Sequence, residues 1–219
     1  MSIAILLPTL NEEEGIGGMI DKVREVSKGE WNVYVVDSGS TDKTVEIAKA
    51  RKANLIHLEK RGKGIAVKKA FSAISEDFLV LIDADMSYSP EDINWVLGQL
   101  KACDVVLGSR FRGHIEKGAI SGMNIFGNSA LTAMANALYG KSVSDVCTGM
   151  WGFTKKAYKS MEIDAPHFEL EVNFFTQAAK LGLKLCEVPI SYQKRAGTSK
   201  LGIGDGFKIG TYLITHKLK

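Results

Sequence analysis

The chain has 219 residues, of which 45% are hydrophobic, 24% are charged and only 4 are prolines. This profile is typical of one folded domain or two small ones, and it excludes a disordered tail, a collagen-like fibre and a small disulfide-framework protein. The net charge of +3 is concentrated at the C-terminal end, because residues 184–219 hold seven Lys or Arg against two acidic residues. We therefore expect no nucleic-acid partner, whereas a local site for an anion or an acidic surface stays open.

The cysteines and the apolar runs constrain the compartment. Cys103, Cys147 and Cys186 are widely spaced and form no CxxC pair, which predicts free, buried thiols rather than a disulfide framework or a zinc ribbon. The apolar residues 3–7 follow no basic leader and end at Pro8, which predicts a strand and not a signal peptide. The sequence contains no run of 18 apolar residues, so no membrane-spanning helix is predicted. We expect a cytoplasmic protein.

Short apolar runs alternate with helix-period segments through the first half of the chain. Apolar residues at helical spacing predict a helix from Ile16 to Val26, and a second helix is expected to begin at Ser89, which can cap it, with Pro90 in its first turn. This order predicts an α/β fold with a mostly parallel central sheet flanked by helices. The predicted strands are residues 3–7, 33–36, 55–58, 78–82 and 105–107.

The second half of the chain is less regular. A long helix rich in small residues is predicted over 121–139, followed by a mixed segment through Phe153. A helix over 169–181 and a strand over 185–190 come next.

The C-terminal segment differs in composition from the rest. From Gln193 it is a glycine-rich basic loop followed by a short amphipathic helix, which could lie on a membrane surface or pack on the domain. We therefore predict a main domain over residues 1–201 and an amphipathic appendage over residues 202–219.

Three polar clusters directly follow predicted strands, at Pro8–Glu14, Asp37–Asp42 and Asp83–Asp85. Parallel sheets bind ligands at the carboxyl ends of their strands, so these clusters are expected to converge on one crevice. Alternation directs Asp83 and Asp85 to opposite sides of an extended chain, so one can bind a divalent cation while the other contacts a sugar or ribose. Mg²⁺ or Mn²⁺ is commonly held by one or two carboxylates and diphosphate oxygens. Taken singly, the first cluster fits an ordinary strand exit better than a site, and the Asp83–Asp85 cluster fits a solvated turn equally well.

In this order the clusters resemble family 2 glycosyltransferases of the GT-A fold, and most closely the dolichyl- or polyprenyl-phosphate sugar synthases. The resemblance extends from Pro8 to about Leu201, nearly the whole chain. The order and spacing of the matching landmarks are more specific than any one of them. They are Pro8–Glu13, Asp37–Asp42, Arg61-Gly62-Lys63-Gly64, Asp83–Asp85, Gly108-Ser109-Arg110, Thr148-Gly149 and Arg195-x-Gly-x-Ser199-Lys200.

The resemblance implies a function and a site. It implies transfer of a hexose or N-acetylhexosamine from a GDP- or UDP-linked donor to a polyprenyl or dolichyl phosphate with Mg²⁺ or Mn²⁺, and we expect the protein to be peripheral at the inner face of a membrane. We expect in-line displacement with inversion at the sugar, because no second carboxylate is clearly placed as a covalent nucleophile. It assigns the metal to Asp83, Asp85 and Ser87, and it gives the catalytic positions as Asp85, Arg110 (facing the acceptor phosphate) and Glu171 (near the sugar). The implied nucleotide-sugar site consists of Pro8, Asn11, Glu12, Asp37, Lys63, Asp83, Arg195, Ser199 and Lys200.

A phosphate acceptor removes the need for a general base, because it is already ionised at neutral pH and needs only to be positioned. Arg195 and Lys200 would stabilise charge on the departing diphosphate together with the metal. The four histidines are isolated in the sequence. Of these, His167 is closest to a site position, and a packing or loop role fits it better.

The chain departs from the family pattern in two places. The synthases often continue their Asp-Ala-Asp run to a glutamine ligand, where this chain has Ser87. A second acceptor-side arginine is common in the family, but residues 113–140 contain none, which leaves Arg110, Arg112 and Lys117 as candidates. Two alternatives stay open: a non-catalytic sugar-nucleotide-binding subunit of a membrane glycosylation complex, and a family 2 transferase with a non-lipid acceptor.

Overall fold

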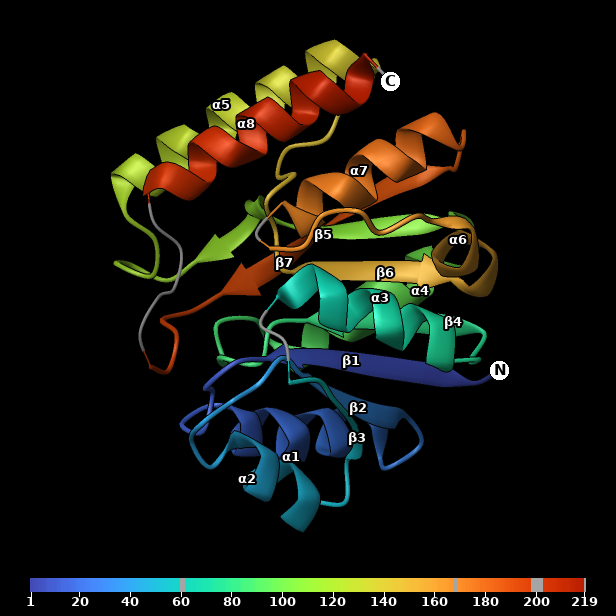
Figure 1. Cartoon of the computed structure of the whole chain (residues 1–219), viewed down its shortest axis with the longest axis vertical. Coiled ribbons are helices and arrows are strands. Elements are labelled where there is room, and N and C mark those ends of the chain that lie inside the picture. Colours follow the sequence, from blue (N-terminus) through green and yellow to red (C-terminus); the bar gives the residue numbers. More distant parts are fainter. Residues whose placement is uncertain (60–61, 168, 198–202, 219) are drawn as a thin grey trace.

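The computed structural model describes residues 1–59, 62–167, 169–197 and 203–218, and within these ranges it contains a seven-stranded sheet of order β3-β2-β1-β4-β6-β5-β7 (Figure 1). Its strand pairs are parallel except those of β6, which runs antiparallel to both β4 and β5. The predicted mostly parallel sheet is therefore confirmed. The strands are β1 (Ile3–Thr9), β2 (Asn32–Asp37), β3 (Asn54–His57), β4 (Phe78–Ile82), β5 (Val105–Ile115), β6 (Met150–Thr154) and β7 (Leu185–Tyr192).

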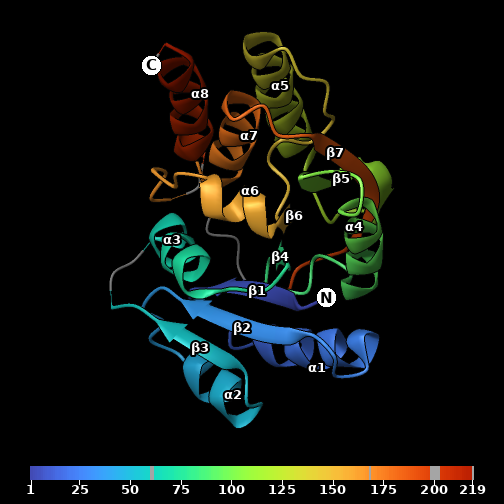
Figure 2. The ribbon, with the colours of Figure 1, turned by 90° about the vertical axis from the view of Figure 1, so that its right-hand side faces the viewer.

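Helices cover both faces of the sheet, and side-chain alternation assigns each strand residue to one face. In β1, Ala4 and Leu6 pack in the core under α3, α6 and α7, whereas Ile5 and Leu7 pack under α1 and α4 (Figure 2). The helices are α1 (Ile16–Ser27), α2 (Thr44–Ala50), α3 (Lys63–Ala73), α4 (Ile93–Gln99), α5 (Gly122–Tyr139), α6 (Lys155–Ser160), α7 (Leu170–Lys180) and α8 (Ile203–Lys217).

Helix starts agree with the sequence in one case and differ in another. Ser121 caps α5, because its side chain accepts a hydrogen bond from the backbone N–H of Asn124 at 3.2 Å. Ser89 does not cap the next helix as predicted. Its hydroxyl donates to Glu91 instead, and a 3-10 turn over Pro90–Asp92 precedes α4.

Strand β6 lies within the segment that the sequence left mixed. Its residues Trp151 and Phe153 are fully buried, and it is inserted between β4 and β5, which precede it in the chain. Gly152 is also required there, since a Cβ atom would lie 2.3 Å from Val96 of α4. The position of β6 is determined by its pairing with β4 and β5, and a short local sequence pattern does not encode that pairing.

The C-terminal helix α8 packs on the domain with one face. It lies beside α5 in both views, and its residues Ile209, Tyr212 and Leu213 are buried (Figures 1 and 2). The Tyr212 hydroxyl donates to Asp164, and His216 Nε2 lies 3.0 Å from the other oxygen of the same carboxylate. The predicted domain boundary between residues 201 and 202 falls outside the described ranges.

No helix within the described ranges is both long enough and apolar enough to cross a bilayer.

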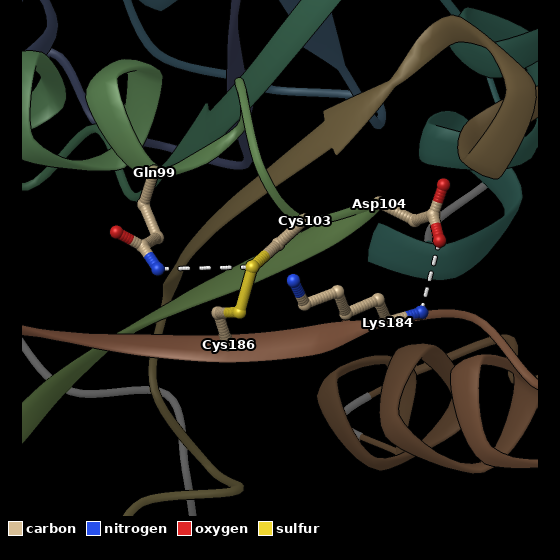
Figure 3. The surroundings of a disulfide bond; sticks show 5 residues. All are labelled: Gln99, Cys103, Asp104, Lys184 and Cys186. Atoms are coloured by element: carbon tan, nitrogen blue, oxygen red, sulfur yellow. Dashed lines mark hydrogen bonds between the residues drawn. A yellow bond between two sulfur atoms is a disulfide. The ribbon is translucent and has the colours of Figure 1, made fainter.

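The prediction of three free thiols is wrong for two of the cysteines. Cys103 and Cys186 form a disulfide, with their Cα atoms 6.1 Å apart, where the parallel strands β5 and β7 begin (Figure 3). Their spacing of 83 residues gives no sign of this, because the contact arises from strand pairing. Cys147 remains free, and burial raises the pKa of its thiol to about 12.

A thiol count tests the disulfide directly. In denaturant without reductant, a chromogenic thiol reagent should find one thiol per chain, and after reduction it should find all three. Replacing both Cys103 and Cys186 by alanine should lower the free energy of unfolding by about 2–5 kcal/mol, because the bond closes a long loop. Three reactive thiols before reduction would show that the bond is absent.

Candidate active site

A pocket of about 710 Å³ opens where β1, β2 and β4 end. Most of the predicted site residues line it: Pro8, Glu12, Lys63, Asp83, Asp85, Arg110, Glu171 and Arg195. Asn11, Asp37 and Ser87 are not among its lining residues, and Ser199 and Lys200 fall outside the described residues. His167, which the sequence assigned to packing, lines the pocket as well.

Lys63, the first residue of α3, bridges two carboxylates across the pocket. Its Nζ donates to Asp83 Oδ1 and to Glu171 Oε1, both at 2.7 Å. Burial alone would lower the pKa of Lys63, but the attraction of the two carboxylates outweighs it and raises that pKa above its usual value. For Glu171, burial has the larger effect and raises the pKa of the carboxyl, although the attraction of Lys63 lowers it. Lys63 is thus a permanent cation at this wall.

Close packing fixes the position of Lys63 and Asp83. The backbone N–H of Gly64 donates to the Pro166 carbonyl at 3.1 Å, and a Cβ at Gly64 would lie 1.6 Å from the Ala165 carbonyl oxygen. On the opposite side, a Cβ at Gly149 would lie 2.0 Å from Asp83 Oδ2. The glycines of two predicted landmarks are therefore required by close approach.

Arg110 is held in a nearly buried ion pair with Asp145. Its Nε and Nη2 donate to the two oxygens of Asp145 at 2.7 and 2.8 Å, and Nη2 also donates to the Cys147 carbonyl at 3.0 Å. The guanidinium lies over the ring of Tyr192, 5.3 Å from its centre. This two-pronged pairing fixes the arginine in the pocket wall. Asp145 was not identified from the sequence, since it follows no predicted strand.

Asp85 is contacted on both carboxylate oxygens. Oδ1 accepts hydrogen bonds from the backbone N–H and the hydroxyl of Ser87, and Oδ2 lies 3.2 Å from Nη1 of Arg195. Ser87 is only 1% exposed and does not line the pocket. In this structure it orients Asp85, and its assignment as a metal ligand stays a prediction.

Asp37 organises the loop after β2 from a fully buried position. It accepts hydrogen bonds from the backbone N–H groups of Gly39 and Ser40 at 3.1 and 3.0 Å and from the Thr9 hydroxyl at 3.2 Å. His57 Nδ1 lies 2.9 Å from the same carboxylate. The parallel register of β2 and β3 pairs Asp37 with His57, so the contact is long-range and had no sequence signal.

Asn11 joins the loops after β1 and β2. Its side-chain oxygen accepts from the backbone N–H of Thr41 at 2.8 Å, and its own backbone N–H donates to Ser40 Oγ at 2.8 Å. The predicted convergence of the first two polar clusters is therefore seen in the structure. Nucleotide contacts of Asn11 and Asp37 stay a prediction.

The charged groups of this site are unbalanced in favour of acid. Within the described residues, five carboxylates face three cations, a formal balance of −2; the carboxylates are Glu12, Asp83, Asp85, Asp145 and Glu171, and the cations are Lys63, Arg110 and Arg195. No group of three or more His, Cys, Asp or Glu in the described ranges could hold a metal alone. The donor set therefore fits a hard divalent cation that takes further oxygens from a diphosphate and water.

The same pocket is also lined by residues of α5, of α8 and of the turn before α5. This part, called the arm below, carries the apolar side chains Ile120, Met123, Leu131 and Ile209 together with the amides of Asn124 and Asn128. The same two helices also expose apolar side chains at Ile125, Phe126, Met134, Phe207 and Ile214. Met123 is exposed as well, although it also lines the pocket. Charged residues at the strand ends and mainly apolar residues of α5 and α8 thus line one cavity.

The close approach at Gly149 can be tested by substitution. Gly149→Ala should lower the free energy of unfolding by about 1–3 kcal/mol, because the new methyl group displaces Asp83. Gly98→Ala on α4 is the matched control, since nothing lies within 4 Å of its Cβ and alanine favours the helix. Urea denaturation gives both values, and equal stability of the two variants would contradict the contact.

Comparison with known proteins identifies the family. A low-salt glycan biosynthesis hexosyltransferase of Haloferax volcanii is 31% identical over 98% of this chain, which spans about half, 54%, of that relative's length. A dolichyl-phosphate hexose transferase of the same organism is 33% identical over 97% of this chain and 92% of its own. The fold matches a glucosyl-3-phosphoglycerate synthase of Mycobacterium tuberculosis, crystallised with Mn²⁺ and UDP-glucose, with a TM-score of 0.75 and 25% identity over 99% of this chain and 78% of that one. Residues 4–161 match the model of glycosyl transferase family 2, and the chain belongs to that family.

Proposed function

We propose that this protein transfers a hexose or N-acetylhexosamine from a nucleotide diphosphate sugar to a polyprenyl or dolichyl phosphate, with inversion at the sugar. One observation carries the proposal: a single cavity has a charged half at the strand ends and a mainly apolar arm lined by α5 and α8. The charged half suits a diphosphate sugar, and the arm suits a prenyl chain. The similarity to a dolichyl-phosphate hexose transferase supports the same acceptor class.

In the donor half, Asp83 and Asp85 would hold Mg²⁺ or Mn²⁺ together with diphosphate oxygens. The Mn²⁺ bound in the Mycobacterium synthase supports a divalent ion in this fold. Such an ion stabilises negative charge on the departing diphosphate. Lys63 and Glu171, paired at 2.7 Å, would bind hydroxyl groups of the donor sugar. Arg195, with Ser199 and Lys200 beyond the described residues, would contact the diphosphate.

In the acceptor half, the lipid phosphate is the nucleophile and carries its charge already. Arg110, fixed by Asp145, would orient it in the pocket. The apolar lining of the arm would exclude water, which otherwise competes as an acceptor. No side chain is required as a proton acceptor, because the phosphate is already ionised.

A donor panel tests this function. GDP-mannose, UDP-glucose and UDP-N-acetylglucosamine are incubated with Mn²⁺ or Mg²⁺ and a short polyprenyl phosphate, and lipid-linked sugar and free nucleotide are measured. Asp85→Asn should reduce turnover by about 10²-fold or more, because the metal and Arg195 both act through this carboxylate. Asp21→Asn, an exposed pair with Arg51 outside the pocket, is the control and should retain activity.

The fold match favours one alternative acceptor, because the Mycobacterium enzyme is a glucosyl-3-phosphoglycerate synthase. The same assay therefore includes 3-phosphoglycerate in place of the lipid. If product forms with 3-phosphoglycerate but not with polyprenyl phosphate, the acceptor is a small phosphate compound and the proposed lipid acceptor is wrong. Donor binding without turnover on any acceptor would favour a non-catalytic sugar-nucleotide-binding subunit.

We also propose that the outer surface of α5 and α8 rests on a membrane at its inner face, with the protein peripheral. Apolar side chains on both helices are exposed there, and the same two helices line the arm of the pocket. Lys208 and Lys217 on α8 would favour anionic lipid headgroups. The inner face of α8 is anchored through Asp164, so the helix can hold this orientation.

Vesicle binding tests the surface. The pair of changes Phe126→Glu and Phe207→Glu should weaken binding to anionic vesicles by about tenfold or more, because both rings are among the most exposed apolar side chains of the two helices. Trp95→Glu is the control, since this exposed tryptophan lies on α4, outside the α5–α8 surface. Co-sedimentation measures binding, and equal loss in both variants would contradict the assigned surface.

A further inference from the structure

Arg195 lies between two carboxylates that come from different strand ends. Its Nη1 is 3.2 Å from Asp85 Oδ2, and its Nη2 is 3.6 Å from Glu12 Oε1. Asp85 follows β4 and Glu12 follows β1, so the guanidinium spans the two loops. All three side chains line the same pocket. The guanidinium of Arg195 is thus shared between the carboxylates of Asp85 and Glu12.

The oxygen atoms of Asp85 leave little room for a second cation beside Arg195. Oδ1 already accepts hydrogen bonds from the backbone N–H and hydroxyl of Ser87, a buried residue. Oδ2 is the oxygen that faces Arg195. Because a divalent ion needs a carboxylate oxygen at short range, it competes with the guanidinium for Oδ2.

Backbone hydrogen bonds on both sides of Arg195 hold it in this position. The N–H of Gln193 donates to the Ser87 carbonyl, and the N–H of Ala196 donates to the Asp85 carbonyl, both at 2.8 Å. The segment on either side of Arg195 is therefore fastened to the Asp-Ala-Asp loop. The placement of the guanidinium on Asp85 is a consequence of that attachment and not a chance contact of a surface side chain.

One atom of Arg195 is poorly accommodated. Its Nε is buried and has no hydrogen-bond partner among the described residues. An unsatisfied buried donor destabilises the conformation that buries it, and the cost is greater for a charged group. The side chain is therefore held by Asp85 and Glu12 but gains from a rearrangement that offers Nε an acceptor. A diphosphate supplies such oxygens.

We propose that Arg195 is the resident cation of the metal site: it occupies Asp85 in the metal-free protein and leaves when the metal binds. This extends the metal dependence proposed above and depends on it. Arg195 then has two mutually exclusive partners, the Asp85 carboxylate without metal and the donor diphosphate with metal. Binding of metal and binding of donor therefore reinforce each other, because each removes the arginine from the position that opposes the other.

The first test measures Mn²⁺ affinity without nucleotide, from the electron paramagnetic resonance signal of free Mn²⁺ at about 0.15 M salt. Arg195→Met should bind Mn²⁺ about three- to tenfold more tightly than the unaltered protein, because the competing cation is gone. Arg51→Met is the matched control: it removes a positive charge that pairs with Asp21 and lies outside the pocket lining, and its affinity should be unchanged. Equal or weaker affinity in Arg195→Met would overturn the proposal.

The second test needs no substitution. Saturating Mn²⁺ should accelerate tryptic cleavage after Arg195 in the unaltered protein, because the side chain is released from Asp85. Cleavage after Lys28, in the exposed turn that follows α1 and outside the pocket lining, serves as the internal reference in the same digest. An unchanged ratio of the two rates would overturn the proposal, even if Arg195→Met failed to fold.

A third measurement separates this proposal from the proposed function. The Mn²⁺ titration is repeated with UDP and with GDP present. If either nucleotide promotes Mn²⁺ binding but Arg195→Met does not bind Mn²⁺ more tightly without nucleotide, the proposed metal site is supported and the resident-cation role of Arg195 is wrong. If no protein binds Mn²⁺ under any condition, the metal dependence and the inference both fail.

Discussion

Electrostatic repulsion among carboxylates at the strand ends is the constraint on which the site depends. The loops after β1 and β4 and the first turn of α7 bring Glu12, Asp83, Asp85 and Glu171 to one pocket. Carboxylates that share one partly dehydrated pocket repel one another, and this arrangement is unfavourable unless cations lie among them. Each carboxylate is accordingly matched with a lysine or arginine from a different segment. The remaining negative charge makes the pocket receptive to a divalent ion.

The two halves of the cavity are maintained by different forces. The charged half is held by ion pairs and by glycines that permit close backbone approach, as at Gly64 and Gly149. The apolar arm depends on packing of α5 against α8, whose inner face is fixed by hydrogen bonds to Asp164. Arg110 lines the same cavity, and its two hydrogen bonds to Asp145 hold the guanidinium in place.

Local patterns in the sequence predicted most of the sheet and much of the pocket, because strand periodicity and polar strand exits are local signals. The features they missed arise from contacts between distant segments. β6 is a strand because β4 and β5 flank it. The disulfide exists because β5 and β7 are parallel neighbours, and Asp145 and His57 acquire their roles only through Arg110 and Asp37. The roles of Asn11, Asp37 and Ser87 in ligand binding stay predictions.

The strand order has a consequence for how the protein is made. Central strand β1 pairs with β4 across about 75 residues, and β5 pairs with β7 across 80. Contacts of this span form slowly, because a long loop must close before they contribute. The pocket is complete only when Arg195 reaches Asp85 and Ile209 reaches α5, so a chain still under synthesis has the loops after β1 and β2 without the complete pocket. Competence to bind ligand therefore reports that folding has reached the C-terminal helix.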